Sequence, residues 1–92
     1  MASEEDVKAF ERDVRCVPTK IIMKKLKEGE KTLSELEAAL NEALEDPLDP
    51  VVAKLYVDQL EAEGFIEKKG GNGNPSYTVT QKWKDLEAKK ES

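Results

Sequence analysis

The stretch that decides the fold reads VDQLEAEGFIEKK and covers residues 57–69. Val57 and Leu60 have the spacing of one apolar face of a helix. Gly64 is the residue type that most often ends a helix in a left-handed conformation. Residues 65–69 then leave as an extended strand. This stretch therefore predicts a helix that ends at a glycine and leads directly into a strand.

The residues that follow predict a β-hairpin and a closing helix. The sequence GGNGNP at residues 70–75 consists of residues that accept a positive φ or fix a turn. SYTVT at residues 76–80 has the β-branched, alternating character of a returning strand. We expect the hairpin to span residues 65–80 and a helix to span residues 81–90, with Trp83 and Leu86 on one side.

Upstream, capping signals predict the starts of four helices. Ser3 precedes three acidic residues, as expected at the positive end of a helix dipole. Pro18 and Pro50 suit the first turn of a helix, where a missing amide hydrogen costs nothing. Thr32 and Glu35 have the spacing of a capping box. The four helices are expected at residues 3–16, 18–28, 32–45 and 50–63.

This order of elements predicts a winged helix of the α+β class, mainly α. It has a three-helix helix-turn-helix core, a two-stranded β-hairpin wing, and extra N-terminal and C-terminal helices. The chain of 92 residues is short enough that we expect a single domain over residues 1–92.

Within residues 32–86 the pattern resembles that of winged helix-turn-helix regulators of the MarR, PadR and ArsR kind. The matching positions are Val57, Leu60, Gly64, Phe65 and Ile66, with Thr32, Glu35 and Leu36 upstream and Tyr77, Thr78, Val79, Thr80 and Leu86 downstream. The resemblance implies DNA binding through the helix at 50–63 and through the wing. One position departs from it. Trp83 stands where these families often have glycine, which suggests a different packing of the last helix.

The composition argues against an enzyme. The chain has no histidine and one cysteine, Cys16, so the commonest general base and a zinc site of Cys and His ligands are both missing. We expect no cofactor and no metal. No run approaches the roughly 20 apolar residues of a membrane span, and the acidic N-terminus lacks the apolar core of a signal peptide. A cytoplasmic protein is therefore expected, with no membrane partner.

The charge distribution works against DNA binding by the helix-turn-helix. The net charge is −5, yet residues 35–67 contain ten acidic side chains and one basic side chain, a net charge of −9. Duplex DNA repels such a surface. The outward positions of the helix at 50–63 are also unusual for reading bases, because Val51 and Leu55 are aliphatic.

The preferred interpretation is nevertheless a small DNA-binding transcriptional regulator that binds double-stranded DNA mainly through its wing. Of the twelve lysines outside the acidic segment, nine lie on the second helix and its exit or around the wing and the last helix, and the sequence does not show whether these nine form one patch: Lys20, Lys24, Lys25, Lys27, Lys31, Lys68, Lys69, Lys82 and Lys84. The candidate DNA-binding residues are Lys54, Tyr56, Lys68, Lys69, Asn72 and Asn74.

The alternative interpretation is an acidic winged-helix module that binds a protein, or mimics DNA toward a basic partner. Val51 and Leu55 would form the contact surface, or else the N-terminal stripe of Val7, Phe10 and Val14. The sequence leaves open the alternative that this stripe covers Val51 and Leu55. A homodimer through the stripe, or through Trp83 and Leu86, is a further expectation.

Overall fold

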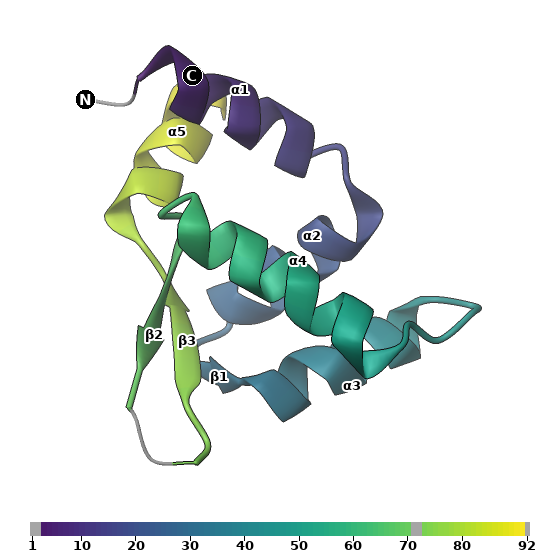
Figure 1. Cartoon of the computed structure of the whole chain (residues 1–92). Helices are drawn as coiled ribbons and strands as arrows, with labels where there is room; N and C mark the ends of the chain where they lie inside the picture. Colours follow the sequence, from purple (N-terminus) through teal and green to yellow (C-terminus); the bar gives the residue numbers. More distant parts are fainter. Residues whose placement is uncertain (1–2, 71–72, 92) are drawn as a thin grey trace.

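The computed structural model describes residues 3–70 and 73–91. Over these residues the chain forms five helices and three short strands (Figure 1). In order they are α1 (Glu4–Asp13), α2 (Val17–Lys27), β1 (Lys31–Thr32), α3 (Leu33–Ala43), α4 (Pro50–Ala62), β2 (Ile66–Lys69), β3 (Ser76–Val79) and α5 (Gln81–Glu91).

Local signals set the ends of most helices. The Ser3 hydroxyl caps α1 by accepting from the Asp6 amide, and the Thr32 hydroxyl caps α3 by accepting from the Glu35 amide. In each helix the carboxylate of the same residue, Asp6 or Glu35, also accepts from the backbone amide of the capping residue, so both helices start with a complete capping box. Gly64 has a φ of 80°, and the amide after it donates to the Leu60 carbonyl, which closes α4.

The boundaries differ from the expected ones by up to three residues. The first helix ends at Asp13 rather than 16, because the chain turns at residues 14–16 so that Cys16 can take the N-cap position of α2. The helix expected to reach 45 ends at Ala43, and Leu44 is already extended, with a ψ of 141°.

The wing belongs to a three-stranded antiparallel sheet in the order β1-β3-β2. The sequence indicated only the β2–β3 hairpin. The two-residue strand β1 pairs Lys31 with Tyr77 and Thr32 with Ser76, and so ties the start of α3 to the half of β3 nearest the wing loop. At the other end, the Thr80 amide donates to the Phe65 carbonyl and closes the hairpin.

The core lies between the helix-turn-helix, the sheet and the two terminal helices. Its buried apolar residues come from every helix: Phe10, Ile22, Met23, Leu26, Leu36, Leu40, Ala53, Val57, Leu60, Phe65, Ile66, Tyr77, Trp83 and Leu86. In Figure 1, α4 crosses the middle of the molecule, α3 lies below it, and α1 and α5 lie beside each other above it.

An aromatic cluster attaches α1 and α5 to this core. The Trp83 ring on α5 lies 4.7 Å from the Phe10 ring on α1 and 5.2 Å from the Phe65 ring, between centroids. The N-terminal stripe therefore packs on the body of the domain, and Phe10 is only 3% exposed. Phe10 is thus a core residue and is not available as a contact surface on the single chain. Val7 and Val14 are half-buried at the edge of the same core.

Candidate nucleic-acid interface

Helix α4 follows α3 after a short acidic turn and holds the position of a recognition helix. The Asp49 carboxylate caps it by accepting from the Val51 amide at 2.9 Å. Ala53, Val57 and Leu60 are buried against the core, which orients the opposite face outward.

The outward face of α4 is apolar. Val51 is 68% exposed, Val52 37% and Leu55 60%. The N-terminal stripe does not cover Val51 and Leu55, because it packs on the aromatic cluster instead. These two residues therefore lie in solvent, where a base-reading helix would usually present polar side chains.

The one basic residue of α4 is already paired. The Lys54 ammonium lies 2.9 Å from the Asp58 carboxylate, one helical turn along. Hydrogen bonding to Asp58 and the negative charge of Asp58 raise the pKa of Lys54. Contact with a phosphate would have to compete with this carboxylate. The candidate Tyr56 lies on the margin of α4, half-buried in a pocket of about 170 Å³ that is also lined by Arg12 and Cys16.

The wing presents its two lysines on opposite faces. Directly paired residues of an antiparallel ladder share a face. Lys68 pairs with Tyr77, whereas Lys69 pairs with Ser76. Tyr77 is buried on the face of the sheet that looks toward α4. Burial is the main cause that raises the pKa of Tyr77, and the negative charges of Glu61 and Asp58 on α4 raise it further. Only Lys68 therefore shares the face of the sheet that looks toward α4.

Both wing lysines are exposed, and neither has an ion pair within the described residues. Asn74 is exposed at the described end of the wing loop. The candidate Asn72 lies outside the described residues. The wing thus offers free cations and an amide at a solvent-exposed edge.

Three of the nine lysines that could form a basic patch are engaged in ion pairs. Lys27 lies 2.5 Å from Glu87, Lys25 lies 3.5 Å from Glu28, and Lys82 lies 2.7 Å from Asp6. These pairs reduce the positive potential around α2 and α5.

The acidic turn has no such compensation. Between residues 32 and 53 there are six acids and no base. None of the six forms an ion pair within the described part of the chain, although Glu35 and Asp49 cap helices. They are Glu35, Glu37, Glu42, Glu45, Asp46 and Asp49. Three of them, Glu45, Asp46 and Asp49, lie in the turn directly before α4 and make its start negative.

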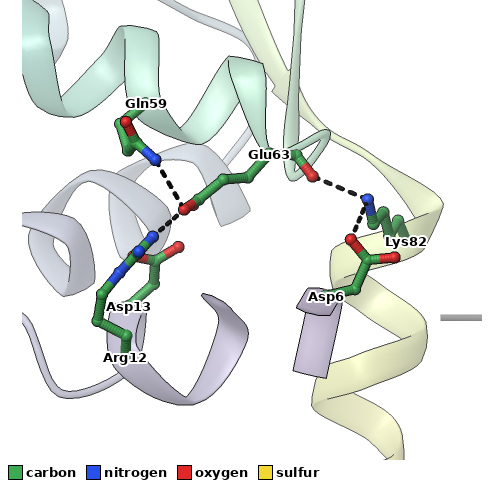
Figure 2. Close-up of polar contacts among 6 residues, drawn as sticks. All are labelled: Asp6, Arg12, Asp13, Gln59, Glu63 and Lys82. Atoms are coloured by element: carbon green, nitrogen blue, oxygen red, sulfur yellow. Dashed lines mark hydrogen bonds and ion pairs between the residues drawn. The ribbon is translucent and has the colours of Figure 1, made fainter. Parts of the chain in front are cut away.

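A partly buried ionic cluster holds the other end of α4 (Figure 2). The Arg12 guanidinium of α1 pairs with the Glu63 carboxylate and, at 3.2 Å, with Asp13. Gln59 donates to the same Glu63 oxygen at 3.0 Å. Asp13 is 4% exposed, and its burial raises its pKa despite Arg12.

Lys82 extends this cluster to α5. Its ammonium donates to the Glu63 backbone carbonyl at 2.8 Å and pairs with Asp6, as Figure 2 shows. The hydrogen bond from Lys82 lowers the pKa of Asp6. The cluster thus joins α1, α4 and α5. The sequence did not reveal it, because its members are up to about 75 residues apart and none belongs to a recognisable motif.

Neither a metal site nor a membrane-spanning helix occurs among the described residues. Residues 3–70 and 73–91 contain no group of three His, Cys, Asp or Glu side chains placed to hold a metal ion. Within the same ranges no helix combines the length and the apolar character needed to cross a membrane.

The fold is that of winged-helix transcriptional regulators. A MarR-family regulator from Enterococcus faecalis superposes with a TM-score of 0.73 at 18% identity, over 99% of this chain and 81% of that one. The repressor BigR from Xylella fastidiosa superposes with a TM-score of 0.70 at 16% identity, over 91% of this chain and 82% of that one. A homodimeric winged helix-turn-helix DNA-binding domain from Mycobacterium bovis superposes with a TM-score of 0.71 at 12% identity, over 94% of this chain and 76% of that one. No family model and no curated relative matches the chain. The predicted winged helix is confirmed.

Proposed function

We propose that this chain is a small DNA-binding transcriptional regulator of the winged-helix type that contacts double-stranded DNA through its wing. The observation that carries the proposal is the fold, which matches transcriptional regulators over nearly the whole chain. These structural neighbours are regulators rather than enzymes, and we propose no catalytic step.

The wing is favoured over α4 by its charges. Lys68 and Lys69 are exposed cations without a partner, and they can neutralise phosphates on either side of the hairpin. Asn74, together with Asn72 in the same loop, would approach the backbone or the minor groove. Lys54 would contribute only after releasing Asp58, and Tyr56 would lie at the margin of the interface.

A homodimer is the second part of the proposal. The Mycobacterium bovis domain is homodimeric, and an operator with two half-sites requires a two-fold protein. In this chain a groove of about 340 Å³ runs between α1 and α5 and is lined by the apolar residues Val7, Phe10 and Leu86 together with four charged ones: Glu11, Arg15, Lys89 and Lys90. Half-buried Val7 and Val14 would become buried on dimerisation at this end. Sedimentation velocity tests it, and a monomer at high protein concentration would remove the dimer from the proposal.

The test of DNA binding is a salt titration. Fluorescence anisotropy with a labelled duplex should show binding at low ionic strength. The logarithm of the binding constant should fall linearly as the logarithm of the salt concentration rises. Changing Lys68 and Lys69 together to glutamate should reduce the slope by about two. The matched control changes Lys20 and Lys24 to glutamate, two exposed lysines on α2, and alters the net charge equally. Absence of binding at low salt, or an equal loss in the control, contradicts the proposal.

A further inference from the structure

The first half of the outward face of α4 carries an apolar strip. Successive residues of a helix are about 100° apart, so Val51 and Leu55 lie along one line on the side away from the buried Val57. Both are exposed, Val52 lies beside Val51, and the polar residues Asp58 and Gln59 end the strip one turn after Leu55. Exposed apolar side chains that lie singly need no explanation, but a strip on an element otherwise suited to recognition indicates a contact surface.

Acidic residues lie beside the start of this strip. Glu45, Asp46 and Asp49 are exposed in the turn that leads into α4. None of these three has an ion pair within residues 3–70 and 73–90. Lys54 is the only base of α4, and Asp58 neutralises it at 2.9 Å. The strip is therefore apolar at its centre and negative at its border.

This combination of charge and shape discriminates between occupants. Duplex DNA is repelled by the acidic border and finds few hydrogen-bond donors along the strip. A second copy of the chain, docked symmetrically, would place one acidic border against another, and like charges facing each other oppose such an interface. A protein segment with basic flanks and an apolar centre satisfies both features.

We propose that the strip of α4 and the acidic turn bind a basic amphipathic helix of another protein. Apolar side chains of the partner, three and four residues apart, would pack along Val51 and Leu55. Its flanking lysines or arginines would lie against Asp46 and Asp49. The surface is separate from the two wing lysines, so the inference does not depend on DNA binding by the wing.

The probe is a synthetic peptide of leucine and lysine, about 18 residues long, with leucines at helical spacing so that it can form an amphipathic helix when bound. Two controls accompany it: a peptide of the same composition with the leucines scattered, and one with lysine replaced by glutamate. In ¹⁵N–¹H correlation spectra of the full chain, the first peptide should shift amides from Glu42 to Asp58. Shifts spread over the whole surface, or equal binding of the scattered peptide, would overturn the proposal.

Two substitutions of exposed apolar residues sharpen this test. Leu55→Lys places a charge at the centre of the strip and should weaken peptide binding about tenfold or more, as expected for a central contact residue. Val17→Lys is the matched control, because Val17 is 53% exposed on α2 and the change of charge is the same. It should alter binding by less than about threefold. Equal losses in the two variants would refute the assignment of the surface.

The two proposals fail independently. Loss of peptide binding in Leu55→Lys with unchanged duplex binding supports the proposed partner surface. Loss of duplex binding in the same variant would show that α4 contacts DNA and would overturn the inference. The double substitution of Lys68 and Lys69 should leave binding of the leucine–lysine peptide intact or stronger, since it removes positive charge from the chain.

Discussion

Replacing Arg12 by methionine should destabilise the domain, because Arg12 neutralises two buried carboxylates at once. It pairs with Glu63 and Asp13, whose side chains are 11% and 6% exposed. Removing one partner of a fully buried ion pair costs roughly 3–5 kcal/mol. The Arg12 side chain is itself 58% exposed, so solvent already screens part of the interaction. We therefore expect a loss of about 2 kcal/mol in the free energy of unfolding.

For a domain of this size, a loss of about 2 kcal/mol lowers the Tm by roughly 8–16 °C. Thermal and urea unfolding followed by circular dichroism at neutral pH measure both quantities. Methionine retains most of the aliphatic length of arginine, so the change isolates the charge and its hydrogen bonds. A loss smaller than about 0.5 kcal/mol would place Arg12 among ordinary surface residues and refute the reasoning.

A double substitution identifies the cause. Adding Glu63→Gln to Arg12→Met removes one of the two stranded charges and should recover part of the lost stability. If the double variant is as unstable as the sum of the two single variants, the two residues act independently and the cluster has no energetic role.

The protonation of Asp13 determines how the stability of the Arg12→Met variant depends on pH. Because burial raises the pKa of Asp13, the folded state takes up its proton at a higher pH than the unfolded state does. The stability that Asp13 contributes therefore falls as the pH rises from the ordinary aspartate value through the folded pKa. The loss of folding stability caused by Arg12→Met should therefore be smaller in mildly acidic solution than at neutral pH. A larger loss in mildly acidic solution would contradict the role given to Asp13.

Two further predictions concern helix ends. The Thr32 amide lowers the pKa of Glu35, so Glu35 contributes stability that is present above its ordinary pKa and lost as the pH falls through the folded value. Glu35→Gln should flatten this part of a Tm-against-pH profile, and an unchanged profile would contradict the capping role. Gly64→Ala should cost about 1–2 kcal/mol in urea unfolding, because a Cβ at its φ of 80° is strained and would lie 3.1 Å from the Lys82 ammonium. Gly70→Ala has the same φ and open space, so a loss as large as that of Gly64→Ala would show that the contact with Lys82 adds nothing.

The features that the sequence predicted correctly rest on local physical chemistry. The helix cap at Ser3, the capping box at Thr32, the proline at the start of α4 and the glycine after it involve only near neighbours. Such interactions form wherever the helix forms, so spacing alone reveals them. The outward position of Val51 and Leu55 also followed from the helical period, since the buried face of α4 was evident, but the period did not show that the N-terminal stripe leaves them exposed.

The features that the sequence did not reveal depend on what lies across space. Strand β1 has two residues, too few to show alternation, and exists because β3 lies beside it. The period of the N-terminal stripe identified an apolar face but not what covers it. Trp83 departs from the family pattern in the sequence, and in the structure its ring contacts those of Phe10 and Phe65.

The most direct test of the central claim is a map of amide shifts on adding duplex DNA at low ionic strength. The claim is that the wing, rather than the recognition helix, contacts DNA. The largest changes in ¹⁵N–¹H spectra should fall on Glu67–Lys69 and Gly73–Ser76, with small changes on Val51–Asp58. The largest changes on Val51–Asp58, or none anywhere, would contradict the claim.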